Sequence, residues 1–127
     1  MVSAGQTATA TVTVTESNIA KTMKSGSLEV FATPAMCALM EEAAQAAVQP
    51  HLEEGEGTVG ISLSITHEAP TPLGAIVTAK ATVSAVEGLS LIHIYLLIDF
   101  VTNIALYIIN YLFHNGHRHC AFITRAQ

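Results

Sequence analysis

One segment of the chain has the composition and the boundaries of a long helix, and it limits which folds the sequence can adopt. Residues 35–49 contain neither glycine nor proline and are rich in Ala, Met, Leu, Glu and Gln, which favour helix. Thr33 suits the N-cap, Pro34 suits the first helical position and Pro50 ends the helix. Apolar residues at helical spacing predict one buried face: Met36, Leu39, Met40, Ala43 and Ala47.

Three segments around this helix alternate with the period of a strand. Residues 7–15 alternate Ala or Val with Thr, and residues 58–68 and 74–87 also alternate apolar and polar positions. In the second segment an inward row is expected to contain Val59, Ile61, Leu63, Ile65 and His67. One long helix with antiparallel strands predicts an α+β fold, in which the sheet wraps around the helix.

Size and charge exclude several classes of protein. The chain has 127 residues, half of them apolar, which suits a single domain with one core. Its formal net charge is −5, whereas a nucleic-acid-binding protein usually carries a cluster of basic residues. Cys37 and Cys120 form no framework of paired cysteines, and the N-terminus lacks the pattern of a signal peptide. We therefore expect a cytoplasmic protein without nucleic acid as a partner.

Two adjacent glutamates in the helix compete for a role in catalysis. Glu41 falls beside Cys37 and Ala44 on a helical wheel, along the edge of the apolar stripe, whereas Glu42 falls on the wet side. Glu41 is therefore expected to be partly desolvated, which makes a carboxylate a better base. The alternative is that both are ordinary surface residues.

Three further residues combine a structural role with a possible chemical one. His67 ends the inward row of its strand, where it is either a core residue or a proton-exchanging group at the mouth of a pocket. Thr33 caps the helix, whose first N–H groups can also stabilise an oxyanion. Gly60 is expected to face away from the apolar row, at a bulge or where a backbone or ligand approaches closely.

The string FATPAMCALMEEAA, followed by TVGISLSITHEAPTPLG, resembles the fluoroacetyl-CoA thioesterase-like family of hotdog-fold acyl-CoA thioesterases. The resemblance covers residues 7–88. It implies a hotdog homodimer with active sites between protomers, an acyl-CoA substrate and no metal or cofactor. It also implies that Thr33, Glu41 and His67 are catalytic and that Gly60 binds substrate.

The chemistry implied by this resemblance is hydrolysis of a short-chain acyl-CoA thioester. Glu41 acts either as the nucleophile or as a general base on water, His67 transfers protons and Thr33 orients Glu41 or the water. The fluoroacetyl-specific enzyme closes its pocket with phenylalanines before the helix, but residues 24–27 read KSGS here. We therefore do not expect selectivity for a fluorinated acyl group. A non-catalytic acyl-binding domain and a truncated dimerising scaffold are the alternatives.

The composition changes after Gly88, so residues 89–127 form an anomalous tail. They contain one acid, Asp99, and four of the six histidines. The string LSLIHI is also the in-frame translation of a transposon-end adapter, which favours a tail of foreign sequence. The tail would then leave excess apolar surface or pack irregularly, because apolar residues occupy both parities of 89–100. It is expected to carry no catalytic group.

Two other interpretations of the tail remain open. The first is that it supplies the last two buried strands. The second is a membrane segment over 89–113, although polar residues within it would be costly: His93, Asp99, Asn103 and Asn110. No metal site is predicted at His114, His117 and His119, because they have no carboxylate or fourth ligand at a suitable spacing.

Overall fold

The computed structural model of the protein describes residues 1–87 with their side chains, and the backbone of residues 91–99 and 105–115. The elements in chain order are β1 (Thr7–Thr13), α1 (Ala20–Met23), α2 (Thr33–Val48), the short 3₁₀ helix η1 (Gln49–His51), β2 (Glu56–Ser64), β3 (Ile76–Glu87), β4 (Leu91–Asp99) and β5 (Ala105–Asn115).

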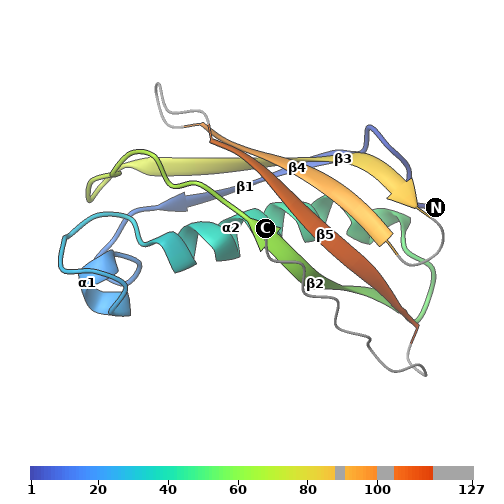
Figure 1. Cartoon of the computed structure of the whole chain (residues 1–127), viewed down its shortest axis with the longest axis horizontal. Coiled ribbons are helices and arrows are strands. Elements are labelled where there is room, and N and C mark those ends of the chain that lie inside the picture. The colour runs from blue at the N-terminus through green and yellow to red at the C-terminus, as the bar shows by residue number, and fades with distance from the viewer. Residues whose placement is uncertain (88–90, 100–104, 116–127) are drawn as a thin grey trace.

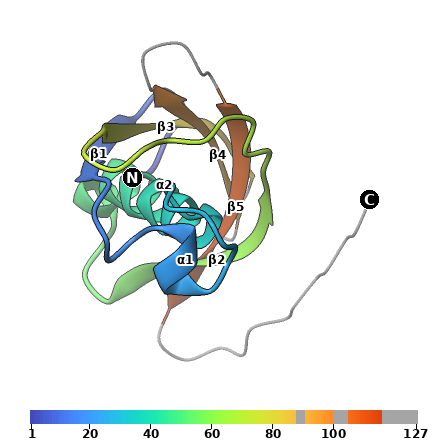
Figure 2. The same cartoon turned by 90° about the vertical axis from the view of Figure 1, so that its left-hand side faces the viewer.

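The strands form one antiparallel sheet in the order β1-β3-β4-β5-β2. This sheet curves around α2, so that the helix lies along its concave side (Figures 1 and 2). The predicted α+β fold, a sheet wrapped around one long helix, is confirmed. Strand β2 lies at one end of the sheet and β1 at the other, so among the described residues each of them has an unpaired outer edge.

The core lies between α2 and the half of the sheet formed by β1 and β3. All five residues of the predicted helical stripe are buried, as are Ala44 and Val48 beside them. Opposite them, the sheet also presents small and branched apolar side chains: Ala10, Val77, Ala79, Ala81 and Val83. Alanine on both surfaces allows the helix and sheet backbones to approach closely, and close packing is the ordinary state of a protein core.

The helix begins one residue earlier than the sequence predicts. Ala32 occupies the N-cap position, and its carbonyl accepts the first helical hydrogen bond from the N–H of Met36. No side chain caps the helix, so the prediction that Thr33 is the N-cap was wrong. As the first helical residue, Thr33 has a hydroxyl free from capping, and that hydroxyl bonds to another part of the chain.

Strand β2 departs from regular alternation at a β-bulge. Its pairing with β5 shifts between Gly60 and Ser62, where one extra residue is inserted. Gly60 faces α2, contrary to prediction, and His67 also contacts that helix. The two residues are seven positions apart, an odd spacing that regular alternation would place on opposite faces, so the bulge explains how both reach the helix.

The predicted inward row of β2 is therefore only partly correct. The fractional exposures of Val59 and Leu63 are 41% and 40% in the single chain. Ile65, beyond the bulge, packs against the core. Because β2 is an edge strand and α2 packs mainly on β1 and β3, the described residues of one chain give this part of the sheet little cover.

The tail contributes two strands to the middle of the sheet. Strand β4 pairs with β3, and β5 joins β4 to β2, which agrees with the strand interpretation. The origin of the tail sequence stays a hypothesis, and the predicted excess of apolar surface concerns side chains that lie outside the described residues. Within the described part of the chain, no helix is both long and apolar enough to cross a membrane.

This pairing predicts that a chain ending at Gly88 will not fold cooperatively. Strand β2 is bonded to the sheet through β5, and β3 would lose its neighbour β4. Thermal unfolding followed by circular dichroism, with the full chain as control, measures the effect. A cooperative transition in residues 1–88, at or above the midpoint of the full chain, would instead support the foreign-tail interpretation.

Candidate active site

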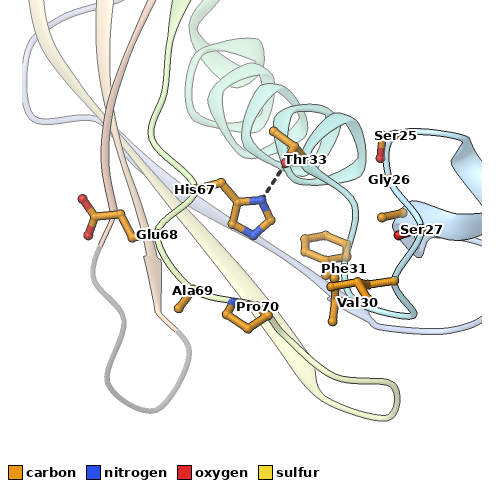
Figure 3. Close-up of a pocket in the computed structure, with 12 residues that line it drawn as sticks. Ser25, Gly26, Ser27, Val30, Phe31, Thr33, His67, Glu68, Ala69 and Pro70 are labelled. Atoms are coloured by element: carbon orange, nitrogen blue, oxygen red, sulfur yellow. Dashed lines mark hydrogen bonds between the residues drawn. The ribbon is translucent and has the colours of Figure 1, made fainter.

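A short hydrogen bond joins the start of α2 to the segment that follows β2. Oγ1 of Thr33 lies 2.7 Å from Nδ1 of His67, in a partly buried position. Figure 3 shows the second ring nitrogen of His67 directed away from Thr33, toward the space beside Phe31 and Pro70. When Nδ1 accepts the hydroxyl proton of Thr33, the other ring nitrogen carries the imidazole hydrogen and faces this space.

Burial controls the charge of this imidazole. It lowers the pKa of His67 below its ordinary value of 6.5, because a low-dielectric environment disfavours the charged form. At neutral pH the ring is therefore uncharged, and the nitrogen that faces the cavity donates or accepts a proton according to the tautomer of the ring. Its bond to Thr33 fixes the ring orientation at the same time, as a proton-transfer group requires.

Glu41 lies against the backbone of β2 at Gly60. A Cβ atom added to Gly60 would lie 3.5 Å from Oε2 of Glu41, so the glycine leaves room for another atom beside the carboxylate. Glu41 is exposed in the single chain, and the predicted partial desolvation was wrong for that state. Proximity to Gly60, rather than burial, distinguishes Glu41 from the neighbouring Glu42.

Two cavities hold these two pairs of residues. One, of about 380 Å³, includes Thr33 and His67 in its lining. The other, of about 500 Å³, lies between α2 and β2 and is lined by Ala38, Glu41, Glu42, Gln45, Thr58, Val59 and Gly60. Along α2, eight residues from Thr33 to Glu41 correspond to roughly 12 Å at the rise of an α-helix. Within one chain the structure thus pairs Thr33 with His67 and Glu41 with Gly60, in separate cavities.

Cys37, one helical turn before Glu41, is a poor candidate for a nucleophile. It is half-buried with a free thiol, and burial, reinforced by the negative charge of Glu41, raises the pKa of that thiol. The protonated form therefore dominates at neutral pH, and the thiolate is the reactive form.

Of the tail histidines, His117 and His119 lie outside the described residues, and His114 is described by its backbone alone.

The sequence analysis did not find the segment that faces His67 across its cavity. This segment runs from Ser25 to Phe31 and contributes both serine side chains, Gly26 and the ring of Phe31 to the lining (Figure 3). The only local signal was Gly26 with its flanking serines, which indicates a loop but not its position. Its placement depends on long-range contacts, since the Phe31 N–H donates to the carbonyl of Thr71.

Comparison with known proteins shows which families share this sequence and fold. Residues 14–105, more than half of the chain, match the family described as fluoroacetyl-CoA-specific thioesterase. A fluoroacetyl-CoA thioesterase from Streptantibioticus cattleyicolor is 50% identical over 60 residues, or 47% of this chain and 43% of that protein. The matched segment thus spans less than half of that relative.

Solved structures extend the likeness to the whole sheet. A phenylalanine-to-alanine mutant of the fluoroacetyl-CoA-specific thioesterase has a TM-score of 0.81 at 28% identity, over 91% of this chain and 90% of that chain. A hot-dog-like protein from Thermanaerovibrio acidaminovorans has a TM-score of 0.80 at 25% identity, over 89% and 84% of the two chains. The predicted hotdog fold is confirmed.

The lowered pKa of His67 predicts that stability decreases in acid. As the pH falls through about 6.5, the unfolded chain takes up a proton at this residue before the folded chain does. The free energy of unfolding therefore decreases below this pH. Urea unfolding at about pH 7.5 and pH 5.5 should show a smaller decrease for His67→Gln than for the unaltered chain. His51→Gln, outside this cavity, is the control, and an equal decrease in the His67→Gln variant would contradict the assignment.

Proposed function

Since the chain belongs to the fluoroacetyl-CoA-specific thioesterase family, we propose that it hydrolyses the thioester bond of short-chain acyl-CoA molecules. Thr33, Glu41 and His67 are its catalytic residues, and Gly60 lies at the substrate. The observation that carries the proposal is the hydrogen bond that fixes a neutral His67 at the wall of a cavity. The whole chain acts as one domain, without a metal or cofactor.

The reaction replaces a carbon–sulfur bond with a carbon–oxygen bond. In the direct route, Glu41 removes a proton from water as the water oxygen attacks the thioester carbonyl, and the thiolate of CoA leaves and takes up a proton. In the covalent route, the Glu41 carboxylate attacks the carbonyl and expels the thiolate of CoA, which takes up a proton, and water then hydrolyses the resulting mixed anhydride to the free acid and the Glu41 carboxylate. His67 moves protons in either route, while Thr33 holds its ring in position.

A homodimer is part of this proposal, because the two halves of the site lie apart within one chain. No other described strand pairs with the outer edge of β2, and Val59 on this strand is 41% exposed. An exposed strand edge of this kind favours pairing with another chain. We place two copies with their β2 regions adjacent, so that Glu41 of one copy meets the Thr33–His67 pair of the other across a two-fold axis. Each dimer then contains two complete sites.

A cytoplasmic location remains an expectation from the composition.

The second candidate function is a domain that binds acyl groups without hydrolysing them. The separation of Glu41 from His67 favours it if the two never meet in the assembled protein. A cavity beside Thr33 and His67 would then still bind an acyl group, but no carboxylate would be present to activate water.

Substitution of the proposed catalytic residues distinguishes these functions. With acetyl-CoA or butyryl-CoA as substrate, Glu41→Gln and His67→Ala should each lower kcat by on the order of a hundredfold, as loss of an acid–base group usually does. Glu42→Gln, which removes the adjacent charge on the same helix, should retain activity within a few-fold. Thioester hydrolysis is measured by release of free CoA.

Thermal unfolding of each variant controls for loss of folding. Full activity in both Glu41→Gln and His67→Ala would eliminate this catalytic set. Binding of acyl-CoA by the unaltered chain without any hydrolysis would instead support the acyl-binding domain.

A further inference from the structure

The cavity beside His67 has two walls that are held together by backbone contacts. One wall is the segment after β2, with Ala69 and Pro70, and the other is the segment from Ser25 to Phe31. Val30 bridges to Pro72, and the Phe31 N–H donates to the Thr71 carbonyl over 2.8 Å. The distance between the walls is therefore set by the fold at the end nearer to Phe31.

The lining of this cavity combines apolar residues with polar side chains. Phe31 and Ala20 are buried and line it with apolar surface. On the side opposite His67, the lining includes Ser25, Gly26 and Ser27 (Figure 3), and Leu28 follows them in the same loop. Neither serine hydroxyl forms a hydrogen bond with any other described residue, so both are available to a ligand.

Gly26 allows the loop that carries the two serines to lie close to Ala20. A Cβ atom at this position would lie 3.4 Å from Cβ of Ala20, at the lower limit of ordinary contact. A larger residue would therefore press the loop against α1 or displace it into the cavity. The two serines beside Gly26 are the polar side chains that this loop contributes to the lining, next to the apolar Leu28.

We propose that this cavity binds the acyl group of the substrate and selects short acyl groups that carry a hydroxyl, through Ser25 and Ser27. This inference rests on the proposed thioesterase function. An alkyl chain placed against the serines would remove their hydroxyls from water without replacing those hydrogen bonds, which is unfavourable. A hydroxyl on the acyl group replaces them, and sites that bond a substrate hydroxyl discriminate against analogues that lack it.

A pair of substrates with the same number of heavy atoms isolates the hydroxyl. 3-Hydroxypropionyl-CoA and butyryl-CoA differ only by a terminal hydroxyl in place of a methyl group. The unaltered chain should hydrolyse the first with a kcat/KM on the order of tenfold higher. This preference is far smaller than that of an enclosed site, because both serines are exposed.

The double variant Ser25→Ala/Ser27→Ala should lose this preference, chiefly through a lower kcat/KM for 3-hydroxypropionyl-CoA. The ratio between the two substrates is unaffected by partial unfolding, since it is measured on one preparation. Ser17→Ala is the matched control, because Ser17 is an exposed serine outside the cavity and bonds to Thr15; it should keep the ratio unchanged.

Two kinds of result would overturn the inference. One leaves the proposed thioesterase function standing, and the other removes it. Equal kcat/KM for both substrates, or an unchanged ratio in the double variant, removes the role of the serines but leaves a thioesterase. If the unaltered chain hydrolyses no acyl-CoA, the proposed function fails, and selectivity within that reaction fails with it.

Discussion

Close packing of one face of α2 against β1 and β3 is the constraint on which the rest of the structure depends. Ala43, Ala44 and Ala47 are buried on the helix, and Ala79 and Ala81 are buried opposite them on the sheet. Small side chains on both surfaces leave little freedom in the height and rotation of the helix. The helix is thereby fixed with Glu41 and Glu42 turned toward β2 and with its first turn beside the segment that follows β2.

With the helix fixed in this way, two local irregularities of the chain bring the proposed site residues together in two pairs. The bulge between Gly60 and Ser62 allows β2 to present Gly60 to Glu41, and the segment that follows β2 then presents His67 to Thr33. Because the Thr33 hydroxyl is not used as a helix cap, it can hold the imidazole. Both departures from regular secondary structure thus occur at proposed site residues, where strained or irregular geometry is often found in proteins.

The sequence predicted the parts of the fold that depend on local periodicity. The buried stripe of α2 and the existence of β1, β2 and β3 follow from apolar spacing, and all of them are present. The start of the helix was misplaced by one residue, because Thr33 satisfies the usual preference for an N-cap while a tertiary bond to His67 uses its hydroxyl. The face of Gly60 was also wrong, since one inserted residue reverses the alternation that the prediction assumed.

The site was predictable only in part, for a related reason. Thr33, Glu41, Gly60 and His67 were selected through spacing and family resemblance, and the structure places them in two pairs. The serine wall of the cavity was missed because its position depends on contacts between distant segments, such as that of Phe31 with Thr71. Residues 25–28 have no periodic pattern from which those contacts could be predicted.

Glu41 of one copy and His67 of another are proposed to act in one site, and mixing two inactive variants tests this arrangement. Glu41→Ala and His67→Ala chains are combined under conditions that allow subunits to exchange, and acyl-CoA hydrolysis is measured against each variant alone. In a mixed dimer, one composite site has both residues intact, so random exchange should restore about a quarter of the activity of the unaltered protein, as expected for a two-fold dimer. If mixed dimers form but activity stays at the level of the separate variants, the site does not combine residues from two copies.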